Sequence, residues 1–378
     1  MADNLPFQVR DLSAAATDCE VGDMSASLQF DHTKYSDYDF VVDCLNNLPN
    51  RKKRVSRKTL GVNGRVVADA MPTYLANPAT SSSALKEVLK TPRHYLIYQD
   101  PRLKKEKNHF TLGTFCHSAF LEPRKFDLAR VEPDYALNTK EGIANMIEWY
   151  QEELALPASD LRDVSMVALR EMLASLKQKF TEAGMIAVSA EHKQIIEVIR
   201  RAYKIYGGGI LPKLLRLADS EVSFYANDPD TGLKVKVRPD GLLLEENAGF
   251  NAVISLKTTS AETLDQFARD ATKYRYDLSE GMYLDVISHV TGRKFTATIM
   301  VVLQTVHPYQ VMMLYWSPED LESGRYKYHQ AINTLAECKR NNNYPSFDSF
   351  AEEGAKGLIR FELPAYARLA LKEQQANE

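Results

Sequence analysis

The stretch from residue 234 to residue 259 constrains the fold of this chain more than any other segment. Polar and apolar residues alternate over residues 233–237, the pattern of a β-strand with one buried face, and Asp240 follows. An apolar run over residues 253–256 then ends in Lys257. We expect two adjacent strands that bring the Asp240 carboxylate and the Lys257 ammonium to the same end of one sheet.

The composition limits the class of protein. The chain has 378 residues and a formal net charge of −3, so it can bury a large core but carries no general basic coat for nucleic acid. Its four cysteines are scattered, without the spacing of a zinc site or a disulfide framework, which favours a reducing cytoplasm. No stretch approaches the ~20 apolar residues that span a bilayer, so no membrane partner is expected.

Three segments are predicted along the chain. Residues 1–80 are polar and irregular and are interpreted as a small N-terminal extension of unknown role. Residues 81–350 carry the regular patterns of the main domain, and residues 351–378 form a C-terminal tail. The extension holds a basic run at 51–54, which is more often a solvated face than a DNA clamp.

The order of the expected elements indicates an α/β fold. Helices are predicted over residues 82–91, near 113–122, and over most of 140–216, where apolar residues recur at three- and four-residue spacing. The period then changes to two. Further expected elements are a hairpin at 221–225 and 233–237 whose second strand continues through 241–244, strands at 253–257, 295–305 and 310–316, and helices at about 261–290 and 318–340. This order makes a mixed sheet flanked by helices, with a helical annex.

Asp240 and Lys257 are the first candidates for chemistry. Asp240 lies in a Pro-Asp-Gly sequence, which is also an ordinary turn. Lys257 ends a buried strand, so its ammonium must reach a cleft or an acid. Near a metal ion it could orient a hydrolytic water and offset charge on a phosphate, whereas the plainer interpretation is a structural ion pair.

Glu221 and His117 are weaker candidates. Glu221 begins a strand and could supply another oxygen ligand, although an exposed acid at a sheet edge is the simpler interpretation. His117 lies on a predicted helix face, where a lone histidine is more often a hydrogen-bonded packing residue than a ligand.

Several ordered segments together resemble the exodeoxyribonuclease VIII (RecE-type) branch of the PD-(D/E)XK nucleases, found in phages and prophages. The resemblance covers about residues 82–347. Its motifs are the segments 111–123, 221–225, 231–240, 255–259, 274–276 and 343–345. It implies a restriction-endonuclease-like fold, and it matches His117, Glu221, Asp240 and Lys257 to the family's histidine, glutamate, first aspartate and lysine.

This chain departs from the family pattern at two positions. The family carries a second metal-binding acid where this chain has Ser255, whose neutral hydroxyl is a poorer magnesium ligand. Many relatives carry Gln where this chain has Ser279, while the following Tyr283 is retained. Glu280 is adjacent but points roughly 100° away from Ser279 on a helix, so it is not expected to replace that glutamine simply.

The resemblance implies a metal-dependent exodeoxyribonuclease that acts on double-stranded DNA ends in phage-type recombination, in a bacterial or phage-infected cytosol. It implies a possible single-strand annealing protein as partner, and a homo-oligomer. One Mg²⁺ or Mn²⁺ is expected. The expected ligands are Asp240, Glu221, His117 and the Leu256 carbonyl, with Lys257 positioning water; substrate contacts are expected from Lys273, Arg275, Tyr276, Tyr283, Thr258 and Ser255.

The alternative is a catalytically weak or inactive pseudonuclease that binds DNA or scaffolds a recombination partner. It keeps the fold and the basic residues but lacks a competent metal site, because Ser255 stands in place of an acid. A third possibility is that residues 1–80 recruit a partner protein, since they have no match to the nuclease pattern.

Overall fold

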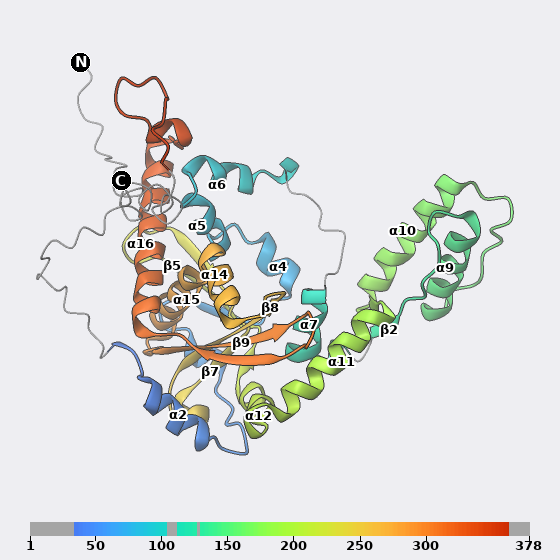
Figure 1. The fold of residues 1–378 in the computed structure, drawn as a ribbon, viewed down its shortest axis with the longest axis horizontal. Helices are drawn as coiled ribbons and strands as arrows, with labels where there is room; N and C mark the ends of the chain where they lie inside the picture. The colour runs from blue at the N-terminus through green and yellow to red at the C-terminus, as the bar shows by residue number, and fades with distance from the viewer. Residues whose placement is uncertain (1–33, 104–111, 127–128, 363–378) are drawn as a thin grey trace, which may run out of the picture.

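The structure, a computed structural model, describes residues 34–103, 112–126 and 129–362 and is built around a five-stranded mixed sheet (Figure 1). Strands β8 and β9 run parallel and the other neighbours are antiparallel. The strand order is β10 (Val311–Tyr315), β9 (Ala297–Gln304), β8 (Ala252–Thr259), β7 (Gly241–Leu243) and β4 (Asp219–Ser220). The expected α/β architecture with a mixed sheet is confirmed.

A second, three-stranded antiparallel sheet stands beside the first and consists of β1 (Arg65–Val67), β5 (Ser223–Asn227) and β6 (Lys234–Val237). The chain passes between the two sheets twice, from β4 to β5 and from β6 to β7. The prediction that residues 241–244 continue the second hairpin strand is wrong, because β6 pairs with β5 whereas β7 pairs with β8. Pro239 lies in the break, where its missing N–H suits a change of partner.

Both faces of the five-stranded sheet are covered, which explains the continuous apolar run of β8. Ile254 and Leu256 of β8 lie in one core with α7 (Leu112–Leu121), α11 (Ala190–Ile205) and α12 (Ile210–Leu217). Val253, on the opposite face, lies in a second core with α15 (Tyr276–Thr291) and α16 (Pro318–Asn341). Alternate residues of β8 therefore point to different helical layers.

The long helix expected over 261–290 is instead two helices, α14 (Leu264–Lys273) and α15. Arg275 separates them in a left-handed conformation, with φ 50° and ψ 54°. A non-glycine residue in this region cannot continue a right-handed helix, so the chain turns sharply before Tyr276.

The helical annex extends away from the sheets (Figure 1). Its helices α9 (Lys140–Glu153) and α10 (Met166–Glu182) pack around a core of their own. A parallel pair of short strands, β2 (Ala129–Val131) and β3 (Ile186–Val188), lies at its base. The mostly helical character predicted for residues 140–216 is confirmed, apart from β3.

The described part of the N-terminal region contacts both sheets. Lys52 Nζ lies 2.6 Å from Asp219 Oδ1, and Thr80 forms an isolated bridge with Val235. The predicted boundary near residue 80 stays a prediction, and residues 1–33 and 363–378 of the two predicted end segments lie outside the described residues.

The remaining helices are α2 (Tyr38–Asn46), α3 (Arg57–Leu60), α4 (Met71–Ala76), α5 (Ser82–Val88), α6 (Pro92–Gln99), α8 (Pro123–Phe126) and α13 (Glu245–Ala248), with short 3-10 turns at Pro101–Leu103, Tyr206–Gly208 and Phe347–Phe350. Within the described ranges no helix has both the length and the apolar character to cross a membrane.

Candidate functional site

The two passages between the sheets meet at one point. Glu221 follows β4, Asp240 precedes β7, and the Glu221 backbone N–H donates to the Asp240 carbonyl at 3.3 Å. Glu221 has φ 57°, a left-handed conformation that is uncommon for a residue with a side chain. The chain therefore holds two carboxylate residues where the sheets part, at a cost in backbone strain.

The Asp240 carboxylate is held by groups from two other elements. The Leu256 N–H donates to Oδ2 at 2.6 Å, so β8 fixes one oxygen. Lys257 Nζ lies 3.6 Å from the same oxygen, and His117 Nδ1, on α7, lies 3.6 Å from Oδ1. The structure thus brings together three of the predicted site residues and the main chain of the fourth, Leu256.

The Lys257 ammonium faces several groups at once. It donates to the Leu256 carbonyl at 3.3 Å and lies 5.8 Å from the centroid of the Tyr276 ring. Burial alone would lower the pKa of Lys257, but the carboxylates of Asp240 and Glu280 outweigh it and raise this pKa. Lys257 therefore carries a positive charge at neutral pH.

Glu221 is engaged by Arg238. The Arg238 Nε–H donates to Glu221 Oε2 at 2.6 Å, while Nη1 donates to the Asp69 carbonyl at 2.7 Å. Burial raises the pKa of Glu221; Arg238 opposes this, while the charges of Asp240 and Glu122 add to it. A metal ion at Glu221 would have to share this carboxylate with Arg238 or use its other oxygen.

Glu280 fills the place beside Ser255, and the sequence analysis missed this. The Ser255 hydroxyl hydrogen-bonds both oxygens of the Glu280 carboxylate, each at 2.8 Å. Both residues have 0% exposed surface. The sequence pattern suggests Glu280 only as a replacement for a glutamine at position 279, whereas its carboxylate points to the strand position that lacks an acid. The available signal was a glutamate between the apolar residues Leu278 and Met282 of a helix.

The electrostatics of Glu280 differ from those of a paired surface acid. Burial raises the pKa of Glu280, the Lys257 charge and the Ser255 hydrogen bond oppose this, and the Asp240 charge adds to it. Among the described residues, no cation lies at ion-pair distance from Glu280. Such a carboxylate is costly to bury unless a cation or hydrogen bonds compensate it.

The other predicted substrate residues lie in different surroundings. Lys273 and Tyr274 are exposed at the end of α14, where Lys273 Nζ lies 5.5 Å from the Tyr274 ring centroid. Tyr283 is hydrogen-bonded with Ser82, and its burial raises its pKa well above the usual range. Thr258 alternates with Lys257 on β8, so it points to the opposite face of the sheet. Arg275 and Tyr276 lie at the start of α15, next to Lys257.

The fit of a divalent metal ion depends on Asp240 and the groups around it. In the ranges that the structure describes, no three His, Cys, Asp or Glu side chains lie close enough to hold a metal ion together. The donor chemistry nevertheless suits Mg²⁺ or Mn²⁺, because Asp240 Oδ1, the Leu256 carbonyl and the Glu280 carboxylate are hard oxygen donors. The charges of Glu221 and Glu280 both interact unfavourably with Asp240, and a bound cation would relieve this. Magnesium keeps several waters and needs only one or two carboxylates, so this donor set is sufficient.

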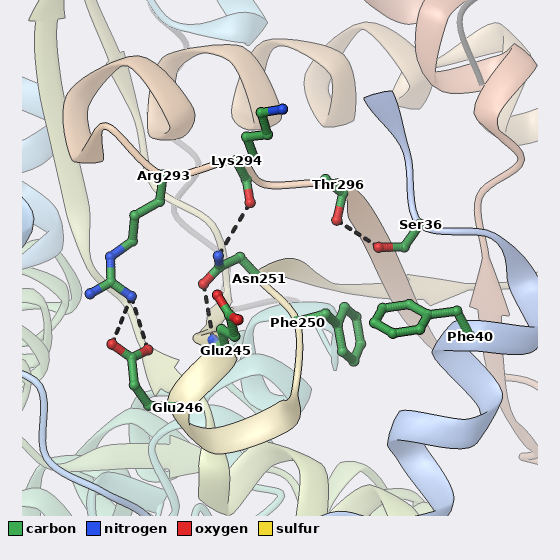
Figure 2. Close-up of a pocket in the computed structure, with 9 residues that line it drawn as sticks. All are labelled: Ser36, Phe40, Glu245, Glu246, Phe250, Asn251, Arg293, Lys294 and Thr296. Atoms are coloured by element: carbon green, nitrogen blue, oxygen red, sulfur yellow. Dashed lines mark hydrogen bonds and ion pairs between the residues drawn. The ribbon is translucent and has the colours of Figure 1, made fainter. Parts of the chain in front are cut away.

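A hollow of about 580 Å³ lies near the N-terminal end of β8, away from Lys257 (Figure 2). Several of its polar groups are bonded to one another. Asn251 accepts from the Glu245 N–H and donates to the Lys294 carbonyl, and both oxygens of Glu246 lie 2.9 Å from Arg293 Nη1. Figure 2 shows the Phe40 ring against the Phe250 ring at the side of this hollow. These contacts attach the N-terminal region and α13 to the sheet and leave no convergent set of reactive groups.

The chain is similar to proteins of one family. The model of a family described as "PDDEXK-like domain of unknown function (DUF3799)" matches residues 81–349. The crystal structure named "Putative exonuclease", from Eubacterium rectale, is 11% identical with a TM-score of 0.44 and covers 80% of this chain and 98% of its own. The crystal structure of SSO0001 is 14% identical with a TM-score of 0.21 and covers 60% of this chain and 90% of its own. No curated protein matches the chain.

Proposed function

Because this chain belongs to the DUF3799 family of PDDEXK-like domains, we propose that it is a metal-dependent exodeoxyribonuclease of the RecE type. Its proposed substrate is the end of double-stranded DNA, cut in phage-type recombination with one Mg²⁺ or Mn²⁺. Asp240, Glu221, His117 and the Leu256 carbonyl are the proposed ligands, and Lys257 is the proposed catalytic lysine.

One observation carries this proposal: the Asp240 carboxylate lies between His117 and Lys257, with 3.6 Å contacts to each, and is oriented by the Leu256 N–H. A purely structural ion pair buried at this site would favour shorter contacts, because the attraction must repay the loss of hydration. Contacts of this length leave Asp240 Oδ1 available to a cation. They also keep the Lys257 ammonium 3.6 Å from the other oxygen, Oδ2, which the Leu256 N–H already orients.

The residues of the chain divide the work as follows. A bound divalent ion supplies a Lewis acid and a water of lowered pKa. The Leu256 N–H holds the Asp240 carboxylate in one orientation, so little reorganisation is needed when substrate arrives. Lys257, charged at neutral pH, offsets the negative charge that develops on the phosphate and orients the attacking water by hydrogen bonding. His117 neighbours Oδ1, where it can ligate the ion or contact phosphate.

We further propose that Glu280 replaces the second acid of the family pattern. Its carboxylate approaches β8 at Ser255, the position where the pattern places an acid on the strand itself. The negative charge is therefore supplied from α15 rather than from β8. With Glu280 included, the site has the same number of carboxylates as the family pattern. Ser255 therefore does not lower the negative charge of the site.

The second candidate is a DNA-binding pseudonuclease, and the observation that favours it is the neutral, fully buried Ser255. The Glu280 carboxylate accepts two hydrogen-bond contacts from this hydroxyl and lies further from solvent than Asp240, whose side chain is 17% exposed. If Glu280 cannot reach the ion, the chain binds DNA without consuming it.

The deciding experiment measures nucleotide release from a linear duplex with Mg²⁺ or Mn²⁺. The natural chain should release nucleotides, and Asp240→Ala and Lys257→Ala should each lower the rate at least roughly 100-fold, since each removes a group that acts on the reacting phosphate. The exchange Ser255→Asp with Glu280→Ser moves the acid back to the strand and should retain activity. Ser255→Asp alone places two carboxylates side by side and should be less active than the exchange.

A natural chain that releases nothing, together with a Ser255→Asp variant that does, would overturn the enzyme proposal and leave the pseudonuclease. A homo-oligomer and an annealing-protein partner are proposed on the same family resemblance, whereas recruitment of a partner through residues 1–80 is proposed because these residues have no match to the nuclease pattern. Light scattering of the full chain and co-purification with a single-strand annealing protein test them.

A further inference from the structure

A second cationic site lies next to the proposed reaction centre, beside the ring of Tyr276, the first residue of α15. Lys86 Nζ, from α5, lies 5.5 Å from the centroid of the Tyr276 ring, and Lys257 Nζ lies 5.8 Å from the same centroid. One ring therefore stands next to two ammonium groups from different elements. Helix α5 also packs against α15, so the two lysines are fixed relative to each other.

Lys86 is half-buried and, among the described residues, forms no ion pair. The pKa of Lys86 is lowered to about 8, chiefly by burial; the charges of Lys257 and Arg275 add to this lowering, and those of Glu280 and Asp277 oppose it. Neither of these two carboxylates lies at ion-pair distance from Lys86. Partial burial of an unpaired cation beside another cation costs free energy, which the contact with the Tyr276 ring offsets only in part.

Arg275 contributes a third cation to the same place. Within the described ranges its Nη1 is buried and has no hydrogen-bond partner, and its Nη2 makes only a 3.5 Å contact with the Leu89 carbonyl. Burial lowers its pKa as well, against the opposing charges of Asp277 and Glu87. A guanidinium with unused N–H groups is suited to a phosphate, which can accept two of them at once.

We propose that Lys86, Arg275 and the Tyr276 ring form a binding site for a phosphate of the DNA other than the one being cut. This inference rests on the proposed function, because it assigns the DNA contact next to Lys257. A phosphate there places negative charge among three cations, and the adjacent base can stack on the Tyr276 ring. Lys86 acts as a positioning residue, which holds the strand while Lys257 faces the scissile group.

The test is DNA binding without catalysis. Fluorescence anisotropy of a labelled duplex, with EDTA and in the Asp240→Asn background, compares Lys86→Met with Lys90→Met. Lys90 is the matched control, since it follows on the same segment but is exposed and paired with Glu87 at 2.7 Å. We expect Lys86→Met to weaken binding about 10-fold, the loss of one charged contact, and to reduce the salt dependence of log K by about one unit. Lys90→Met should change affinity less than twofold.

Stability separates this role from a merely structural one. Because Lys86 is an unpaired cation among cations, Lys86→Met should leave the melting temperature unchanged or raise it, while Lys86→Arg should keep DNA affinity. Duplexes with and without terminal phosphates distinguish the source of the phosphate. A loss confined to phosphorylated ends assigns a terminal phosphate, and an equal loss on all ends assigns a backbone phosphate.

Equal affinities for Lys86→Met and the parent, or equal losses for Lys86→Met and Lys90→Met, would overturn this inference. So would a Lys86→Met variant that is destabilised and not rescued by Lys86→Arg. A chain that cuts DNA with unchanged affinity in Lys86→Met keeps the proposed function and loses the second site. A chain whose DNA affinity depends on Lys86 but that releases no nucleotides keeps the second site and loses the proposed function.

Discussion

Two glutamates near opposite ends of β8 show how differently the same side chain can be used. Glu246, beside the large hollow, has both carboxylate oxygens 2.9 Å from Arg293 Nη1; burial opposes ionisation, but backbone hydrogen bonds and Arg293 outweigh it and lower its pKa. Glu280, beside Ser255, is fully buried, and burial raises its pKa. The Glu246 carboxylate is therefore paired with Arg293, whereas burial of the Glu280 carboxylate costs free energy.

The volume of a hollow is a poor guide to its chemistry in this molecule. The hollow at Glu246 is about 580 Å³, yet the hydrogen bonds and the ion pair among its lining residues attach α13 and the N-terminal region to the sheet (Figure 2). The groups around Asp240 are instead held close without short ion pairs, with contacts of 3.6 Å to His117 and Lys257. A site prepared for a charged ligand keeps its charges incompletely compensated until that ligand binds.

The largest expected difference between the two glutamates is in activity. Glu280→Gln keeps the size of the side chain and a hydrogen-bond partner for Ser255 but removes the negative charge, so nucleotide release from a linear duplex should fall roughly 10- to 100-fold or more. Its matched control is Glu246→Gln, which should change the rate less than twofold. If the two variants are equally active, Glu280 holds no metal and the comparison loses its functional meaning.

The sequence predicted the pairing of Asp240 with Lys257, because each residue follows a segment with a clear strand pattern. It also predicted His117 on α7, though only through the family resemblance. It could not predict where the Glu280 carboxylate points, since this depends on the break at Arg275. That break divides the expected 30-residue helix and sets the rotation of α15 against β8. A residue in the left-handed region cannot be recognised from an arginine in a run of helix-forming residues.

The change of sheet between β6 and β7 was missed for a similar reason. Both segments have the alternation of strands, and periodicity does not say which partner a strand takes. Only the position of Pro239 indicated a break, and proline there is equally compatible with a bulge. The fold class therefore followed from the sequence, whereas the junction that holds Glu221 and Asp240 together did not.

A smaller difference should appear in how stability depends on pH in the absence of metal. The raised pKa of Glu280 means that the folded state binds more protons than the unfolded state above the ordinary Glu pKa of about 4.3. The contribution of protonated Glu280 to the free energy of unfolding is therefore fully present below that pH and is lost as the pH rises through the folded-state pKa. Glu280→Gln should become progressively more stable relative to the natural chain as the pH rises above the ordinary Glu pKa of about 4.3, measured by urea unfolding in EDTA.

For Glu246, whose pKa is lowered, the sign is reversed. Its contribution is present above the ordinary Glu pKa and is lost as pH falls through the folded-state value, so Glu246→Gln should be relatively less stable at neutral pH than at pH 3. Parallel pH dependences for the two variants would mean that the burial of Glu280 is not the cause of its shift.

The smallest expected effect, on the free energy of unfolding, is that of Arg293→Ala. The Arg293 and Glu246 side chains are 30% and 37% exposed, so solvent screens their attraction and the pair should stabilise the fold by about 0–1 kcal/mol. Urea unfolding at low and high salt should show a small loss that shrinks as salt increases, with nucleotide release unchanged. A loss of activity in Arg293→Ala would mean that the two ends of β8 are coupled, because no described contact of Arg293 reaches Asp240 or Lys257. The hollow would then have to be treated as part of the proposed active site rather than as an anchor for the N-terminal region.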